Sequence, residues 1–191
     1  MNILQAIFLG IVQGLTEFIP ISSSGHLIIV PWLLGWEDKA LTSLPFDVSL
    51  HLGTLIAVLV FFAADWARLI RAGFASLAER KIGGDVDRKL AWLLVIGCIP
   101  GAIVGVLAES KIESFFHQPD APHQVPAMIA LAVIMALLGA VLFLAERFAR
   151  HLRSLNQITL KDGLLIGLAQ ALAILPGVSR SGSTITAGLA L

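Results

Sequence analysis

The 191-residue sequence has few charged residues and a single cysteine. Charged residues make up 14% of it, against about a quarter in typical soluble domains, and its mean hydropathy is +0.89. Cys98 has no partner for an internal disulfide, which excludes a disulfide-stabilised secreted domain. No Lys or Arg precedes Lys39, so we expect no cleavable signal peptide at the N-terminus. The composition also excludes a nucleic-acid-binding protein and a disordered tail.

Long uncharged segments are abundant. Five segments of 17 to 25 residues contain no Asp, Glu, Lys or Arg: 18–36, 48–64, 90–108, 121–145 and 163–179. A helix needs about 20 apolar residues to cross the hydrocarbon core of a bilayer. The sequence therefore predicts an all-α, polytopic membrane protein, whose complete spans we expect at 46–64, 90–108 and 127–145.

Basic residues are concentrated in two polar segments. Residues 65–89 contain six Lys or Arg and residues 146–162 contain four, whereas 37–47 and 109–126 contain one each. Loops rich in Lys and Arg stay on the cytoplasmic side of the membrane. We therefore expect the first two segments in the cytoplasm and the other two outside.

The first 36 residues are too long for one crossing and too interrupted for two. Residues 3–18 predict a helix, but Pro20 and the polar run 22–25 interrupt it, and 27–36 is too short to span alone. A re-entrant hairpin over 3–36 explains both facts. Its polar loop at membrane depth is tolerated only where it faces protein or a water-filled cavity.

An internal repeat at an offset of 157 residues supports this hairpin. Six residues of the first copy meet identical residues in the second: Gly10, Gln13, Leu15, Ser22, Ser24 and Gly25. The loop charges place the two copies in opposite orientations, which predicts inverted repeats, a first over 1–160 and a second beginning at 161. Because 161–191 holds only the hairpin of the second repeat, we expect that repeat to be truncated and the chain to be a fragment.

Few ionisable residues lie at membrane depth: Glu17, His26, Asp47, His51 and Arg180. A charge at the bilayer centre costs at least about 2.5 kcal/mol on insertion scales, so such residues are functional candidates. If the hairpin tips meet, Glu17, His26 and Arg180 share a cavity with several hydroxyls. A guanidinium among Ser and Gly N–H groups suits phosphate, and an imidazole with a carboxylate suits proton transfer. The pattern favours a site that cleaves or carries a phosphorylated lipid.

Structural roles remain open for the same residues. Glu17 and Arg180 could form a buried ion pair that joins the hairpins, and His26 could form a hydrogen bond that fixes its loop. Asp47 and His51 have the four-residue spacing of metal ligands on a helix. We interpret them instead as lining the outer start of a span.

Three segments resemble the undecaprenyl-diphosphatase family, the bacterial bacitracin-resistance enzymes: QGLTEFIPISSSGHL at 13–27, FDVSLHLGTL at 46–55 and PGVSRSGST at 176–184. The resemblance covers essentially the whole chain. It implies hydrolysis of undecaprenyl diphosphate to undecaprenyl phosphate, which recycles the lipid carrier for peptidoglycan synthesis. It also implies a multi-pass protein of the bacterial inner membrane whose active site opens to the periplasmic face. A divalent cation, Mg²⁺ or Ca²⁺, would assist; the partners are the polyprenyl lipid and membrane lipids, with a homo-oligomer left open.

The resemblance also implies residue roles. Glu17, His26 and Arg180 correspond to an essential trio, Ser23 to the nucleophile, and Glu17 also to a cation ligand. The remaining substrate-binding candidates are Gln13, Ser22, Ser24, Gly25, Ser179, Ser181 and Thr184. The family allows Glu or Gln at position 13, so Gln13 removes one carboxylate that a mechanism could use.

Our hypothesis for the chemistry places the terminal phosphate on Arg180. Ser23 attacks phosphorus with His26 as base, while Glu17 orients His26 or binds the cation. His26 as the nucleophile is the alternative. A transporter or flippase of a phosphorylated polyprenyl lipid is the competing function, because inverted repeats with broken helices are typical of secondary transporters.

Overall fold

The computed structural model describes residues 2–116, 125–150 and 152–191, and its regular structure within these ranges is helical. The longer helices are α1 (Ile3–Phe18), α2 (Ser23–Leu33), α3 (Leu44–Phe61), α4 (Ala63–Ala78), α5 (Val86–Phe116), α6 (Val125–Phe148), α7 (Leu160–Ala171) and α8 (Arg180–Ala190). Three short 3₁₀ helices, η1 (Lys39–Thr42), η3 (Leu155–Gln157) and η4 (Leu172–Ile174), lie in the connections. The all-α prediction is confirmed.

Within the described residues, three helices are long and apolar enough to cross a membrane: α3, α5 over Val86–Ala108, and α6. α5 and α6 contain the predicted spans 90–108 and 127–145, whereas α3 ends three residues before the end of the predicted span 46–64. Their apolar side chains stay largely exposed: Val60 on α3 is 71% exposed and Phe143 on α6 is 67% exposed. A helix that is apolar all round suits a lipid environment, which supports the prediction of a membrane protein.

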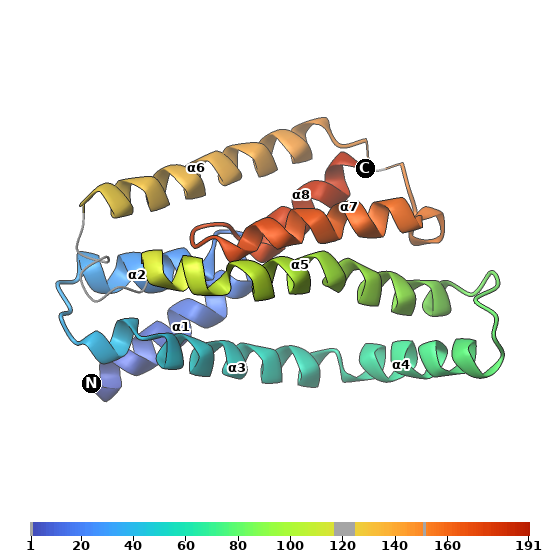
Figure 1. Cartoon of the computed structure of the whole chain (residues 1–191), viewed down its shortest axis with the longest axis horizontal. Coiled ribbons are helices and arrows are strands. Elements are labelled where there is room, and N and C mark those ends of the chain that lie inside the picture. Colours follow the sequence, from blue (N-terminus) through green and yellow to red (C-terminus); the bar gives the residue numbers. More distant parts are fainter. Residues whose placement is uncertain (1, 117–124, 151) are drawn as a thin grey trace.

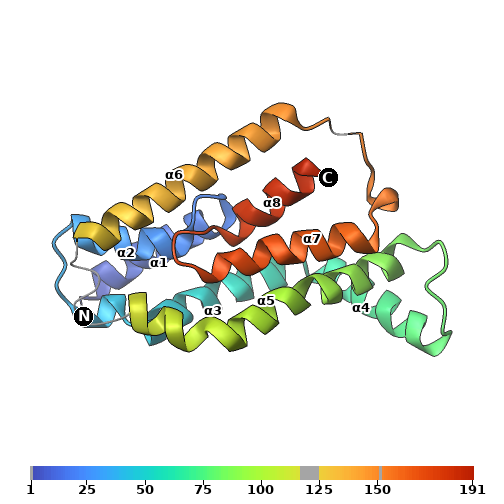
Figure 2. The same ribbon diagram turned by 45° about the horizontal axis from the view of Figure 1, so that its top comes forward.

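Two helical hairpins enter the molecule from opposite ends. The first, α1 and α2, opens toward the end where the N-terminus lies, and its turn is near the centre (Figure 1). The second, α7 and α8, opens toward the other end and also turns near the centre. The view in Figure 2 agrees. The two turns are therefore brought toward each other inside the molecule.

The first hairpin has the predicted first helix, while its second helix begins four residues before and ends three residues before the predicted half-helix at 27–36. α1 ends at Phe18, where the Ile19 N–H still bonds to the Leu15 carbonyl before Pro20. The run 22–25 is not a loop as expected, because Ser22 caps α2 and the next three residues form its first turn. A serine N-cap satisfies a free N–H of the first turn, and this lets a polar run begin a helix.

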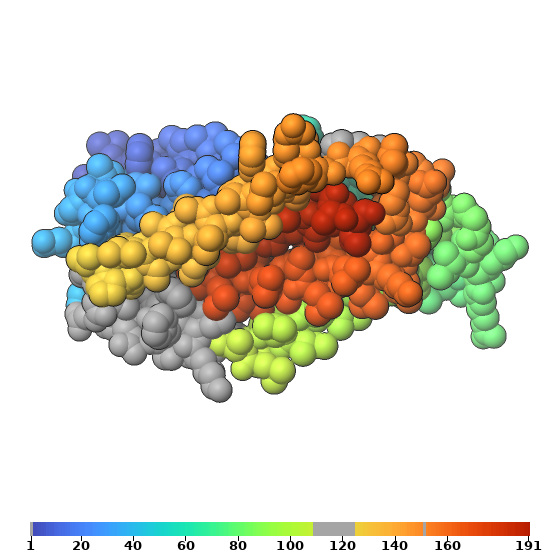
Figure 3. All heavy atoms as spheres, turned by 90° about the horizontal axis from the view of Figure 1, so that it is seen from above, coloured from blue at the N-terminus to red at the C-terminus, as the bar shows by residue number. Residues whose placement is uncertain are grey.

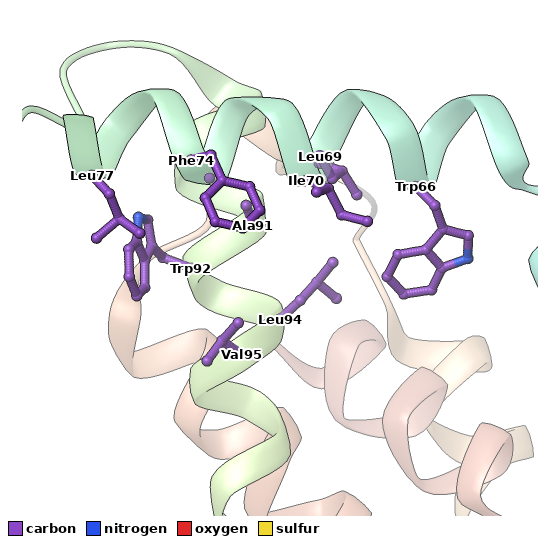
Figure 4. A pocket seen from close by; sticks show the side chains of 10 residues that line it. Trp66, Leu69, Ile70, Phe74, Leu77, Ala91, Trp92, Leu94 and Val95 are labelled. Atoms are coloured by element: carbon purple, nitrogen blue, oxygen red, sulfur yellow. The ribbon is translucent and has the colours of Figure 1, made fainter. Parts of the chain in front are cut away.

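The segment 65–89, expected as a polar cytoplasmic stretch, contains most of α4. Apolar residues recur on one side of this helix, and it packs against α5 through them. The Trp92 indole N–H donates to the Ser76 hydroxyl at 2.7 Å across this contact. Figure 4 shows the apolar groove between the two helices, about 260 Å³ in volume, with Trp66, Phe74 and Trp92 among its lining residues.

Glycines set the close approach of α5 and α7. A Cβ atom at Gly167 would lie 2.4 Å from the Gly97 carbonyl oxygen, and one at Gly163 would lie 3.1 Å from the Leu93 side chain. The second hairpin is therefore held directly against a membrane-spanning helix. On its other side, α6 lies diagonally across the molecule next to α8 (Figure 3).

Candidate active site

The two hairpin turns contact each other, although they are far apart in the chain. The Ser181 hydroxyl donates to the backbone carbonyl of Glu17 at 3.4 Å. A Cβ atom at Gly182 would lie 3.3 Å from the Pro20 carbonyl oxygen, so the two backbones are close together. The expectation that the tips meet is therefore fulfilled at the end of α1 and the start of α8.

The two repeated Ser-x-Ser-Gly motifs make the same N-cap hydrogen bond. Ser22 and Ser179 are the N-caps of α2 and α8, and their hydroxyls accept the N–H groups of Gly25 at 3.3 Å and Gly182 at 3.0 Å. Both helices therefore begin at the meeting point of the hairpins. Helix N-termini carry free N–H groups and positive potential, which favours an anion there.

The first helical residues of α2 and α8 are Ser23 and Arg180, which align at the offset of the repeat. One copy thus places a hydroxyl at this position and the other a guanidinium. Both side chains line the same small cavity. A nucleophile and an anion-binding group are brought together by equivalent positions of the two motifs.

Glu17 is the centre of the hydrogen-bonding network. Its Oε2 atom accepts the Ser23 hydroxyl at 2.5 Å and the Gln13 amide at 3.1 Å. The Nε2 atom of His51, on α3, lies 3.7 Å from the same oxygen. Gln13 is fully buried, and its Oε1 has no hydrogen-bond partner among the described residues. One carboxylate oxygen therefore connects residues of three helices.

Two cavities meet at this network. The smaller, about 70 Å³, is lined mainly by polar residues of both hairpins, including Glu17, Ser23 and Arg180. The larger, about 870 Å³, shares Glu17, Ser24, His51, Ala173 and Arg180 with it. Its lining along α3 combines three polar residues, Asp47, His51 and Thr54, with the apolar Leu44, Val48, Leu52, Leu55 and Val58. A polar pocket beside a larger apolar cavity fits an amphiphile with an anionic head.

His26 lies outside this constellation. Its Nδ1 atom is 2.8 Å from the Ser22 carbonyl oxygen, which also accepts the His26 N–H at 3.2 Å. Neither of the two cavities has His26 in its lining. Glu17 and Arg180 thus share a cavity as expected, while the described contact of His26 is the loop-fixing hydrogen bond that the sequence left open. No described ion pair joins Glu17 to Arg180.

The other predicted substrate-binding residues differ in their access to the cavities. Ser24, Ser179 and Ser181 line the small cavity. Thr184 instead donates to the carbonyls of Arg180 and Ser181 within α8, at 3.1 Å each. Gly25 packs against α6, where a Cβ atom would lie 2.6 Å from the sulfur of Met135 and would displace that side chain.

His51 is the site residue that the sequence interpretation placed elsewhere. Its Nδ1 atom is 2.8 Å from the Asp47 carbonyl oxygen, and its ring lines both cavities. Its charge at membrane depth and its spacing from Asp47 were the available signals. They did not reveal that α3 packs against α1, which is what places the imidazole beside Glu17.

The donor set fits a shared cation better than a closed metal site. Among the described residues, no group of three or more His, Cys, Asp and Glu side chains is arranged to hold a metal. Glu17 is the one carboxylate that lines the small cavity. Mg²⁺ is commonly bound through one or two carboxylates together with phosphate oxygens of the substrate. Glu17 is compatible with that kind of binding.

These features define a helical membrane protein whose two oppositely directed hairpins enclose a site for an amphiphilic anion. The chain belongs to the family described as "Bacitracin resistance protein BacA", whose model matches residues 6–191. The resemblance found in the sequence is thereby confirmed.

Relatives that match over nearly the whole chain are called undecaprenyl-diphosphatase. The protein of Thermomicrobium roseum is 49% identical over 191 residues, which are 100% of this chain and 67% of that protein. The protein of Moorella thermoacetica is 47% identical over 189 residues, 99% of this chain and 66% of the relative. The protein of Desulforudis audaxviator is 46% identical over 185 residues, 97% of this chain and 64% of the relative. The chain thus spans about two thirds of the length of these curated relatives.

Proposed function

We propose that this protein hydrolyses undecaprenyl diphosphate to undecaprenyl phosphate and inorganic phosphate in the bacterial inner membrane. One observation carries the proposal. The Ser23 hydroxyl donates to the Glu17 carboxylate inside a pocket that also receives Arg180 from the second hairpin. A hydroxyl bonded to a base, beside an anion-binding group, is the arrangement that nucleophilic phosphoryl transfer requires. The name of the relatives supports the same substrate.

The phosphate group is held by charge and by oriented N–H groups. Arg180 supplies a planar set of donors that pairs with phosphate oxygens. The N-termini of α2 and α8 add positive potential from two directions, and the hydroxyls of Ser24 and Ser181 line the same pocket. These donors are in place before the reaction, so they stabilise the negative charge that develops as the phosphate transfers.

The first step transfers the terminal phosphoryl group to Ser23. As the Ser23 oxygen forms its bond to phosphorus, the hydroxyl proton passes to Glu17. The bond between phosphorus and the bridging oxygen breaks, and undecaprenyl phosphate leaves with the electron pair and takes this proton from Glu17. In the second step the ionised Glu17 takes a proton from water, the water oxygen bonds to phosphorus, and the Ser23–phosphorus bond breaks. Glu17 then gives the proton from water to the Ser23 oxygen, which restores the hydroxyl.

This mechanism assigns the base role to Glu17, whereas the sequence hypothesis assigned it to His26. The 2.5 Å Ser23–Glu17 hydrogen bond supports the change. His26 supports the loop instead, because its ring and its N–H both contact the carbonyl of Ser22, next to the nucleophile. A bound Mg²⁺ or Ca²⁺, held by Glu17 and the diphosphate, would neutralise part of the charge on the substrate.

The larger cavity accounts for the prenyl chain. Five apolar residues of α3 line it together with Arg180 and Glu17, so a lipid whose phosphate lies in the small pocket can place its first isoprene units against them. We infer that the two hairpins are re-entrant and belong to inverted repeats, a second of which begins at 161. Because the segments rich in Lys and Arg are expected in the cytoplasm, we infer that the first hairpin and the opening of the site face the outer side of the membrane.

The decisive test measures inorganic phosphate released from undecaprenyl diphosphate by the whole protein in detergent. We expect release by the wild type and its loss, by at least about 100-fold, in Ser23→Ala and Arg180→Ala, since removal of one charge-stabilising donor has effects of this size. Ser49→Ala, exposed on α3, is the control for handling. A phosphorylated intermediate mapped to Ser23 supports the nucleophile, and one mapped to His26 contradicts it. Folded wild type that binds the lipid without releasing phosphate would favour transport.

A further inference from the structure

We propose that His51 is a positioning residue of this reaction, which holds the Glu17 carboxylate in place for Ser23. The proposal rests on the phosphatase function proposed above and adds a residue to that site. It starts from geometry: the His51 Nε2 atom lies 3.7 Å from Glu17 Oε2, the oxygen that accepts the Ser23 hydroxyl. His51 therefore adjoins the base and not the nucleophile.

The orientation of the His51 ring is set by its own helix. Its Nδ1 atom is 2.8 Å from the carbonyl oxygen of Asp47, four residues earlier on α3. A carbonyl oxygen can only accept, so Nδ1 carries a hydrogen and Nε2 is the atom directed at Glu17. The Nε2 atom lies in close polar contact with the Glu17 carboxylate, and this contact restricts the rotamers of the glutamate.

Residues of three helices surround the Glu17 carboxylate and together fix its orientation. Gln13 donates to the same Oε2 atom from α1, and Ser23 donates from α2. His51 approaches from α3, and this third direction is supplied by neither hairpin. His51 also lines both cavities, at the boundary between the polar pocket and the apolar one. Without it, the carboxylate could turn toward the larger cavity and away from the nucleophile.

The test compares His51→Phe with His51→Gln in the phosphate-release assay. Phe preserves a planar side chain but has no donor, whereas the Gln amide can still donate to Glu17. We expect His51→Phe to lower kcat by about 10-fold to 100-fold, because the polar contact that holds the Glu17 carboxylate is lost, with KM changed by less than about threefold. His51→Gln should recover most of kcat. Ser49→Ala, two residues away on α3 and exposed, should behave as the wild type.

Thermal unfolding of each variant separates positioning from folding. If His51→Phe lowers Tm by more than a few degrees, the smaller His51→Leu replaces it in the same comparison. Full kcat in the variant without a donor would overturn the proposal, and so would equal losses in the Phe and Gln variants. A rise in KM at constant kcat would also overturn it, because it would assign His51 to substrate binding. Wild type that releases no phosphate would instead overturn the phosphatase function itself.

Discussion

At the scale of single residues, Ser22 and Ser179 make the same N-cap hydrogen bond with different backbones. Ser22 has a φ of 69°, which lies in the left-handed region, whereas the φ of Ser179 is −72°. Glycine adopts a positive φ without steric penalty, but alanine does not. Substitutions at these two positions therefore distinguish the free energy of the cap hydrogen bond from the free energy cost of a positive φ.

We expect Ser22→Ala and Ser179→Ala each to lower the free energy of unfolding by about 1 kcal/mol, the usual effect of losing a serine cap. Ser22→Gly should be more stable than Ser22→Ala, and the difference should be larger than at position 179, because only at position 22 does glycine also relieve a positive φ. Denaturant unfolding in detergent, followed by circular dichroism, measures all four variants. An equal Gly-to-Ala difference at both positions would contradict the backbone explanation.

The candidate site was predictable from the sequence where its residues lie in the repeated motifs. Glu17, Ser23 and Arg180 flank the interruptions of two half-helices, and the prediction that the tips meet placed Glu17 and Arg180 in one cavity. His51 was not predictable as a partner of Glu17, because their proximity depends on how α3 packs against α1. The local pattern also did not reveal that the carbonyl of Ser22 accepts from the His26 ring.

At the scale of helices, the contact between α5 and α7 depends on glycine. A Cβ atom at Gly167 would lie 2.4 Å from the backbone oxygen of Gly97, and neither backbone can move without shifting its helix. We expect Gly167→Ala to lower the free energy of unfolding by about 1–3 kcal/mol through overpacking. Gly105→Ala on α5 is the control, since a Cβ atom there meets nothing within 4 Å. A lower Tm for Gly105→Ala than for Gly167→Ala in thermal unfolding would contradict the packing argument.

The beginning of α7 is held by an ion pair. Arg153 donates to both carboxylate oxygens of Asp162, at 3.1 and 2.6 Å, and the Thr159 N–H and hydroxyl donate to the same side chain. The Arg153 hydrogen bonds first, and those from Thr159 second, hold the pKa of Asp162 well below its ordinary value of 3.8. The ionised carboxylate therefore stabilises the folded protein.

Because the pKa is lowered on folding, this stabilisation is fully present above pH 3.8 and is lost as the pH falls toward the folded-state pKa. We expect Asp162→Asn to lower Tm by a constant amount between neutral pH and about pH 5, with a smaller difference below about pH 4. Thermal unfolding across that range checks the prediction. A difference that grows on acidification would contradict the assigned direction.

The helices were predictable to different degrees. The first was expected over 3–18 and is Ile3–Phe18, because an apolar run followed by Pro20 marks both its extent and its end. α4 was missed because its Arg and Asp residues suggested a loop, although its apolar residues recur on one side and pack against α5. Charge density shows where a segment leaves the membrane, and the helical period shows whether it remains folded there.

At the scale of the whole molecule, the connections rich in basic residues lie at one end. The α4–α5 and α6–α7 connections are at the same end of Figures 1 and 2, and the α2–α3 connection with Lys39 is at the other. This arrangement agrees with the sidedness inferred from charge. It makes the orientation of the protein testable with one cysteine at each end.

We expect Lys39→Cys, in a Cys98→Ala background, to react with a membrane-impermeant maleimide in intact spheroplasts. Lys81→Cys should react only after the membrane is permeabilised, because its segment carries the excess of basic residues. Both lysines are exposed, so accessibility within the protein does not distinguish them. Labelling of both cysteines from the same side, or the reversed pattern, would contradict the inferred topology.

The pocket between the hairpin turns also has a mechanical consequence. Its walls come from segments that lie more than 150 residues apart in the chain, as the bond between Ser181 and Glu17 shows. An anion that contacts both Ser23 and Arg180 would resist separation of these segments. Because it binds only when the two hairpin turns are together, tighter binding stabilises their contact more. In the proposed reaction, each turnover would tighten and then release the contact between the two hairpins, and this contact would be weakest once the product phosphate has left.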